Sequence, residues 1–381
     1  VFDILEKNIR GLDIDRRAYQ LSYFALMMKA RGYNRIFFRG HENMDGERVQ
    51  AVPQVYAIEE SNSIDRNQLK YFGAGLDEVQ KNDAVDQMNG LLDTLKDAKE
   101  YGSILSVEDY DWELLGWFIE KTDTGDQISF ETFGLDGTAE RLRGLVRIGR
   151  VMAWKYEVVA TNRPYAGTSN LGTKINNFVK KHYPDSKADL FAVFIERCRE
   201  MLRGNAYQAM ITQHAWMFLS SFEKLRAKLQ MKDIVNMAHL GARAFEEIGG
   251  EIVQTTSFVM NNRYIAGYKG TYCRLIEPAT QKSKEEMFLA KKNRYAVMQD
   301  IFTKIPGRPL AYWLSENMIR AYVKDAKLFE NIAIPCAGLA TGDNSAFKRS
   351  WYEVAYYNIG FNVKDVSETK KKKKKWYPCN S

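Results

Sequence analysis

The chain has 381 residues, of which 45% are hydrophobic and 27% are charged, and its formal net charge is +7. These values fit an ordinary globular protein of two or three domains. The longest apolar runs, such as 190–195, are far too short to span a bilayer, and no signal peptide is visible. Composition therefore excludes a membrane-spanning protein, and the positive charge is compatible with nucleic acid as a partner.

The cysteines and histidines show no metal-binding pattern. The four cysteines are far apart in sequence, and the four histidines follow no ligand spacing. We therefore predict no metal site and no disulfide framework, and a reducing cytoplasm is the expected compartment. The residues concerned are Cys198, Cys273, Cys336, Cys379, His41, His182, His214 and His239.

The N-terminal stretch 8–15 predicts a short strand that ends in acidic residues. A helix with regularly spaced apolar residues follows and is expected to stop at Gly32. In open α/β sheets a carboxylate at the end of a strand commonly binds ribose hydroxyls, and Asp13 lies at the end of this predicted strand. Asp13 is alternatively a plain surface or capping acid, and Asp15 is placed to cap the following helix.

Residues 40–150 are less regular and predict a largely helical insertion. Helical patterns cover 79–101 and 139–154. The glycines in 72–75 indicate a turn, because no strong strand precedes them. The acidic and aromatic cluster 109–113 is interpreted as a helix start at the surface.

The stretch Lys155–Tyr165 predicts a strand that ends in a polar and aromatic tip. Residues 156–160 are mostly apolar or β-branched, as in a buried central strand. Asn162 is followed by an Arg-Pro pair, and a residue before proline avoids the helical region. We expect a rigid turn at the carboxyl end of the strand, where open α/β sheets bind ligands. An ordinary loop after a strand is the alternative.

The following segments alternate between strand and helix patterns. A helix is predicted from 189, a strand at 206–212, a helix at 221–229 and a pair of strands at 234–241 and 252–260. Together with the 11–15 strand, they predict one mostly parallel sheet with an antiparallel pair at its end. Phe245 lies in the loop of that pair, either at a site or folded onto the core.

Several segments closely resemble one family, the PglX-type adenine-specific DNA methyltransferases of BREX phage-defence systems. The resemblance covers nearly the whole chain and rests on 11–15, 162–165, 189–196, 212–218, 238–245 and 338–344. It implies an α/β fold, a Rossmann-like S-adenosylmethionine-dependent methyltransferase sheet whose first strand is missing. The implied division is 1–39 and 151–280 for the methyltransferase core, 40–150 for the insertion, and 281–381 for a linker and the beginning of the target-recognition region.

The resemblance also implies residue roles. Asn162-Arg163-Pro164-Tyr165 is similar to the Asn-Pro-Pro-Tyr motif of DNA amino-methyltransferases, with Arg163 in place of the first proline. Asn162 and the carbonyl of residue 163 would hold the amine of a flipped adenine, and Tyr165 and Phe245 would stack on the base. Asp13 would bind the ribose of S-adenosylmethionine. The implied partners are double-stranded DNA and other phage-defence proteins.

Two departures from the family pattern shape the expected activity. A glycine-rich cofactor loop has no counterpart before residue 8, so the chain is expected to be a fragment that binds S-adenosylmethionine weakly or not at all. Arg163 supplies the carbonyl but lacks the fixed φ of proline. The alternative function is a truncated or degenerate chain that binds DNA or proteins without catalysis. Lys370–Lys375 is interpreted as a solvated run or as a contact to phosphates.

Overall fold

The computed structural model describes residues 1–43, 46–122, 134–162, 171–245, 253–324, 343–363 and 365–378. The chain divides into two units, Val1–Val323 and Lys324–Ser381. Among the described residues, all sheets belong to the first unit. The second unit contains the short helices α12 (Asn344–Phe347) and α13 (Val366–Lys372).

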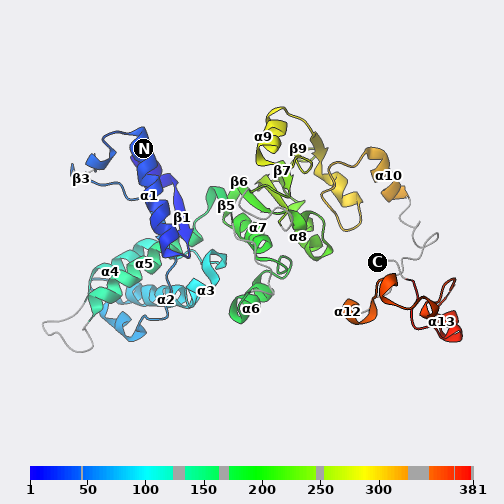
Figure 1. Cartoon of the computed structure of the whole chain (residues 1–381). Helices are drawn as coiled ribbons and strands as arrows, with labels where there is room; N and C mark the ends of the chain where they lie inside the picture. The colour runs from blue at the N-terminus through cyan, green and yellow to red at the C-terminus, as the bar shows by residue number, and fades with distance from the viewer. Residues whose placement is uncertain are drawn as a thin grey trace. The chain divides into compact units, whose positions relative to one another are not determined.

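A six-stranded sheet is the largest sheet of the first unit (Figure 1). Its strands are β5 (Tyr156–Asn162), β6 (Leu202–Gln213), β7 (Asp233–Gly241), β8 (Thr255–Asn261), β9 (Lys269–Arg274) and β10 (Arg294–Met298). Their order across the sheet is β10-β9-β7-β8-β6-β5. β5 is parallel to β6 and β7 is parallel to β9, whereas the other three pairings are antiparallel. The sheet is therefore mixed, with β8 reversed between two parallel pairs.

Helices α7 (Leu190–Glu200) and α8 (Glu223–Leu229) pack against this sheet (Figure 1). α7 begins at Asp189, whose side chain accepts a hydrogen bond from the backbone N–H of Phe191. Most of α7 is apolar, and it supplies a large part of the core. Fully buried members of that core include Phe191, Ile195, Trp216, Leu225, Phe258 and Tyr272. α9 (Gln281–Leu289) and α10 (Glu316–Lys324) follow later in the chain.

A second core lies among the helices that precede β5. These helices are α2 (Glu78–Thr94), α3 (Ala98–Tyr101), α4 (Trp112–Glu120) and α5 (Leu135–Ala153); α6 (Thr173–His182) follows β5. α2 and α4 begin at Asp77 and Asp111, which accept hydrogen bonds from backbone N–H groups of the first turn. Leu91, Phe118 and Leu142 are completely buried between the helices.

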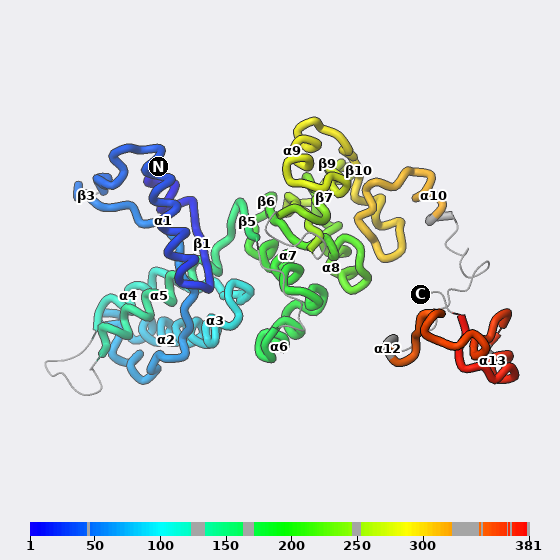
Figure 2. Tube along the Cα trace, in the orientation of Figure 1, coloured from blue at the N-terminus to red at the C-terminus, as the bar shows by residue number. Residues whose placement is uncertain are grey.

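The N-terminal residues form a separate two-stranded parallel sheet of β1 (Arg10–Asp13) and β4 (Gln54–Ala57). α1 (Arg16–Tyr33) contacts both strands. Between them in the chain lies a small antiparallel pair, β2 (His41–Glu42) and β3 (Arg48–Val49). In the trace of Figure 2, the chain then passes through helices α2–α5 and continues into β5 of the six-stranded sheet.

The structure confirms most of the predicted elements. Helices cover the regions expected from 16, 139, 189 and 221, and the pair β7 and β8 is antiparallel. Asp15 caps α1 by accepting a hydrogen bond from the N–H of Arg17. The helix expected over 79–101 is broken in two, because Asp97 adopts φ +55°. The 109–113 cluster is a helix start, as predicted.

Three expectations about the sheets are wrong. β1 does not join the six-stranded sheet but pairs with β4. That sheet is mixed, not mostly parallel, because β8 and β10 are reversed. Among the described strands β5 lies at the edge of its sheet and not in the centre, and Val158 is 60% exposed. Periodicity identifies a strand but says nothing about which strand becomes its neighbour.

Gly270 tests the close packing between β9 and β7. A Cβ at this buried position would collide with the carbonyl oxygen of Ile234 on β7. We expect Gly270→Ala to lower the free energy of unfolding by about 1–3 kcal/mol, the usual effect of overpacking. Gly204→Ala on β6 is the matched control, because nothing lies within 4 Å of its Cβ. Thermal unfolding that shifts equally in both variants would contradict this packing.

Candidate functional site

The carboxyl ends of four strands, β5, β6, β7 and β9, lie along one side of the six-stranded sheet. We call this side the carboxyl edge of the sheet, as distinct from the lateral edge formed by β5. Asn162 is level with Ile211 of β6, Ile211 with Ser257 of β8, and Ser257 with Ala238 of β7. β9 ends on the same edge, because it is parallel to β7. β5 and β7 are three strand spacings apart, or about 14 Å at ~4.8 Å each. Asn162, the residues after β6 and the loop after β7 therefore share one edge.

Asn162 is the last residue of β5 and is exposed. It is held in place by the parallel pairing with β6. The other motif residues, Arg163, Pro164 and Tyr165, lie outside the described residues. The roles assigned to them therefore stay predictions.

Asp13 ends β1 and is half-buried. Its Oδ1 accepts a hydrogen bond from the backbone N–H of Asp15 at 2.8 Å. Oδ2 has no hydrogen-bond partner among the described residues. Asp13 thus fixes the turn into α1 with one oxygen and presents the other at the carboxyl end of β1.

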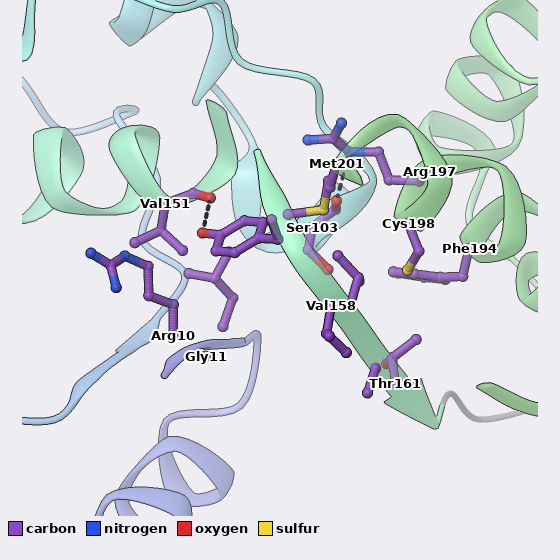
Figure 3. A pocket seen from close by; sticks show the side chains of 14 residues that line it. Arg10, Gly11, Ser103, Val151, Val158, Thr161, Phe194, Arg197, Cys198 and Met201 are labelled. Carbon is purple, nitrogen blue, oxygen red and sulfur yellow. Dashed lines mark hydrogen bonds between the residues drawn. The ribbon is translucent and has the colours of Figure 1, made fainter. Parts of the chain in front are cut away.

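A cavity of about 220 Å³ lies between β1 and β5 (Figure 3). We call it the β1–β5 cavity. Its walls come from β1, β5, α5, α7 and the 3₁₀ turn at 102–104. They comprise Arg10, Gly11, Leu12, Ser103, Val151, Tyr156, Val158, Val159, Ala160, Thr161, Phe194, Arg197, Cys198 and Met201. β1 is paired only on the side of β4, and β5 only on the side of β6, within the described residues. The cavity therefore separates two strands that each have one unpaired edge.

Two hydrogen-bonded side chains hold the cavity walls together. Arg197 is 2% exposed and donates to the carbonyls of Ser103 at 3.3 Å and Met152 at 3.1 Å. Tyr156 donates its hydroxyl to the carbonyl of Val151 at 2.7 Å, and burial raises the pKa of Tyr156 to about 12. The hydrogen bonds from Arg197 to Ser103 and from Tyr156 to Val151 appear as dashed lines in Figure 3. They attach α7 and β5 to the end of α5.

The loop after β7 carries Phe245, which is half-buried. α9 supports this loop from one side. Gln281 donates to the carbonyl of Ala244 at 2.9 Å, and the ammonium of Lys284 donates to the carbonyls of Leu240 and Leu275, each at 2.6 Å. Lys284 is 3% exposed, and burial lowers its pKa. A charge at this depth is retained only because carbonyl oxygens solvate it.

Two histidines contact one another at the same edge of the sheet. His214 follows β6 directly, and its Nδ1 lies 2.7 Å from Nε2 of His239 on β7. Nδ1 of His239 lies 3.0 Å from the hydroxyl of Tyr312. Burial lowers the pKa of both histidines, and that of His239 falls to about 3, with smaller effects of His214, Arg274 and Lys284. Both rings are therefore neutral near pH 7.

The structure brings together only part of the predicted site. Asn162 and Phe245 belong to one edge of one sheet, whereas Asp13 ends a strand of another sheet. The strands ending at Asp13 and Asn162 line the same cavity, although neither residue does. Sequence reasoning missed His239 and Lys284, whose partners lie far away in the chain. The sequence offers only a weak signal for each: Lys284 lies near the start of a helix, and His239 lies in a mostly apolar strand.

Searches of the described residues reveal no group of three or more His, Cys, Asp or Glu side chains arranged to hold a metal ion. Among the same residues, no helix combines the length and apolar character needed to cross a bilayer.

The family model described as Eco57I restriction-modification methylase matches residues 7–245, which include β1, the cavity walls, Asn162 and Phe245. The chain belongs to this family. Two curated relatives are the adenine-specific methyltransferase PglX of Lacticaseibacillus casei (strain Zhang), 39% identical over 99% of this chain, and the adenine-specific methyltransferase BrxX of Escherichia coli O9:H4 (strain HS), 33% identical over 98%. The chain spans 31% of the length of each. The predicted resemblance is thus confirmed.

Solved structures give weaker likenesses. The DNA-bound Type ISP restriction-modification enzyme LlaBIII aligns with 77% of this chain and 17% of its own length, at a TM-score of 0.40 and 10% identity. The M protein of the Type I restriction enzyme EcoKI aligns with 44% of this chain and 43% of its own, at a TM-score of 0.27 and 16% identity. The family assignment rests on the sequence matches.

The buried histidine pair predicts destabilisation in acid. Between pH about 6.5 and about 3, the unfolded chain binds a proton at residue 239 and the folded chain does not. Stability therefore falls as the pH falls, by up to about 1.4 kcal/mol per pH unit. His239→Gln should flatten this dependence in urea unfolding at several pH values. His182→Gln is the control at an exposed histidine. An unchanged pH dependence in His239→Gln would contradict the assignment.

The unpaired edge of β5 predicts self-association of the chain. Exposed apolar edge strands pair with other chains, and a lysine on such a strand opposes that pairing. We expect Val158→Lys to lower the self-association seen by sedimentation velocity at rising concentration, with little change in thermal stability. Val79→Lys, at a valine on α2 that is 79% exposed, is the matched control. Equal effects of the two variants would show that added charge alone is responsible.

Proposed function

We propose that this chain is part of an S-adenosylmethionine-dependent DNA methyltransferase that acts on the N6 amine of adenine. The observation that carries the proposal is Asn162, exposed at the carboxyl end of β5 inside the span matched by the Eco57I family model. The adenine specificity in the names of the two curated relatives supports adenine as the base. The placement of Phe245 on the same edge of the sheet supports it.

Asn162 supplies the chemistry that the amine needs. The exocyclic nitrogen of adenine is a poor nucleophile, because its lone pair is delocalised into the ring. The side-chain oxygen of Asn162 and the carbonyl of residue 163 each accept one N–H of the amine, which directs the lone pair out of the ring plane. Pairing of β5 with β6 fixes the backbone from which Asn162 projects. This contribution is positional and needs no proton transfer from Asn162.

The target adenine must leave the duplex before the amine can reach Asn162. Tyr165 and Phe245 are proposed to stack on the two faces of the flipped base. Gln281 of α9 supports the position of Phe245, because it donates a hydrogen bond to the carbonyl of Ala244, the preceding residue.

Asp13 is proposed to bind a ribose hydroxyl of S-adenosylmethionine, which supplies the methyl group. Its Oδ2 at the end of β1 suits that contact, since Oδ1 is already engaged. The β1–β5 cavity, at about 220 Å³, is smaller than a usual ligand pocket of about 300–1,000 Å³. Asp13 does not line this cavity, so the described residues fit one contact to the ribose of the cofactor and not a pocket for the whole molecule.

The unpaired edges of β1 and β5 support a further detail of the fold. We propose that an extended segment occupies the β1–β5 cavity as a strand. It would pair with β1 on one side and β5 on the other, and so join the two-stranded and six-stranded sheets. Apolar walls from Leu12, Val158 and Val159 suit the side chains of such a central strand. The expected weak cofactor binding of the chain by itself agrees with this proposal and is testable by calorimetry.

The remaining functional proposals follow from the relatives. Double-stranded DNA is the proposed substrate, and the net charge of +7 favours binding to it. A role in phage defence, with other proteins of such a system as partners, is proposed from the likeness to PglX and BrxX.

Asn162→Ala tests the proposed chemistry in a protein that contains this chain. Loss of one acceptor leaves the amine lone pair badly aimed, and we expect turnover to fall by roughly a hundredfold or more, on the scale of single hydrogen-bond losses at active sites. The measurement is transfer of a labelled methyl group from S-adenosylmethionine to duplex DNA. Affinity for the duplex should stay nearly constant.

Asn82→Ala, at an exposed asparagine on α2, is the control and should keep full turnover. Full turnover in Asn162→Ala would overturn the assignment of Asn162. DNA binding without any methyl transfer by the unaltered protein would favour a non-catalytic role instead.

A further inference from the structure

The second unit presents a group of exposed aromatic rings. We call it the aromatic surface, and its members are Phe347, Trp351, Tyr352, Tyr356, Tyr357 and Phe361, which are 44–79% exposed. None of the described hydrophobic side chains in this unit is buried. These rings therefore do not form a core, and their faces are accessible to a partner.

Hydrogen bonds fix the backbone beneath the rings. The N–H of Gly360 donates to the carbonyl of Trp376 at 2.8 Å, and the N–H of Trp376 donates to the carbonyl of Asn358 at 3.1 Å. A Cβ at Gly360 would collide with the ring of Tyr377, so the two segments approach closely. The aromatic surface is thus carried by a defined loop.

Two lysines of the run Lys370–Lys375 donate hydrogen bonds to backbone carbonyls of the aromatic segment, and two others are exposed. Lys372 donates its ammonium to the carbonyls of Phe361 and Asn362, and Lys374 donates to the carbonyl of Tyr357 at 2.7 Å. These two lysines hold the aromatic loop against α13. Lys371 and Lys373 are exposed and make no side-chain hydrogen bond to any described residue. They add positive charge on either side of Lys372, whose ammonium reaches the carbonyl of Phe361.

Charge is concentrated in this part of the chain. Residues 343–378 contain nine Lys and Arg against four Asp and Glu, so they carry +5 of the chain's net +7. A cavity of about 530 Å³ lies at the aromatic surface, and its walls include Arg349, Trp351, Phe361 and Trp376. This volume falls within the range of pockets for small planar ligands. Exposed planar rings in a segment of strong positive charge match a partner with planar bases and anionic phosphates.

We propose that the aromatic surface binds a single strand of nucleic acid. Bases stack on the exposed rings of Trp351, Tyr352 and Tyr356, and phosphates contact Lys371 and Lys373. A single strand is favoured over a duplex, because paired bases do not offer their faces to side chains. The inference deepens the proposed function, since it names a second contact for nucleic acid, but it does not depend on methyl transfer.

The test uses the full 381-residue chain and a fluorescein-labelled 15-nucleotide DNA of mixed sequence, single-stranded or annealed to its complement. Fluorescence anisotropy measures the affinity at 50–200 mM NaCl. Trp351→Ala should weaken single-strand binding about fivefold or more, the loss of one stacked base. Trp351→Phe should keep most of the affinity, because a ring remains. Duplex affinity should change little in both variants.

The double variant Lys371→Ser/Lys373→Ser tests the phosphate contacts. The slope of log affinity against log salt should become shallower by about 0.7 for each lost contact. Lys180→Ser/Lys181→Ser removes the same charge from exposed positions on α6 in the first unit and is the matched control. Trp117→Ala, at a tryptophan of α4 that is 55% exposed, is the control for Trp351→Ala.

Three results would overturn the proposal. Equal losses in the lysine variant and its control would show that net charge alone attracts the DNA. Unchanged single-strand binding in Trp351→Ala would exclude stacking. Self-association of the chain that Trp351→Ala abolishes, with DNA binding intact, would assign the aromatic surface to a protein contact. Loss of methyl transfer in Asn162→Ala with normal binding of the single strand would leave this proposal intact, so the two proposals fail independently.

Discussion

The unpaired edge of β5 is the constraint on which the rest of the first unit depends. Backbone N–H and C=O groups need hydrogen-bond partners, and on this side of β5 no described strand provides them. The same is true of β1 on the side away from β4. Arg197 and Tyr156 hold the surrounding walls without closing the gap. The cavity is therefore bounded by two strands whose pairing is incomplete.

The reversed strand β8 determines which residues can meet. It lies between β6 and β7, so the two flanking strands end on the same side although the chain travels far between them. The end of β5 joins them through its parallel pairing with β6. An asparagine at the end of β5 and a phenylalanine after β7 thus lie at the same end of the sheet. α9 completes the arrangement, because the buried ammonium of Lys284 donates hydrogen bonds to the carbonyls of Leu240 and Leu275.

Local features of the fold could be predicted from the sequence, but strand partners could not. Residues close together in the sequence determine the helix caps at Asp15 and Asp111 and the apolar face of α7. The exposure of Val158 depends instead on the neighbour of β5, which periodicity does not encode. The sequence singles out Asn162 because its motif is contiguous, whereas the contact between His214 and His239 joins residues 25 positions apart. Neither histidine resembles a site until the strands are side by side.

A chain of hydrogen bonds runs from the hydroxyl of Tyr312 through the ring of His239 to the ring of His214, at the carboxyl end of β6. With both rings neutral, one proton lies between the two imidazoles and one between His239 and Tyr312. If the tyrosine donates, every bond points toward His214, whose outer nitrogen then carries a hydrogen. If the chain of bonds runs the other way, that nitrogen offers a lone pair. A shift of protons alone thus exchanges a donor for an acceptor beside β6, without the movement of any heavy atom.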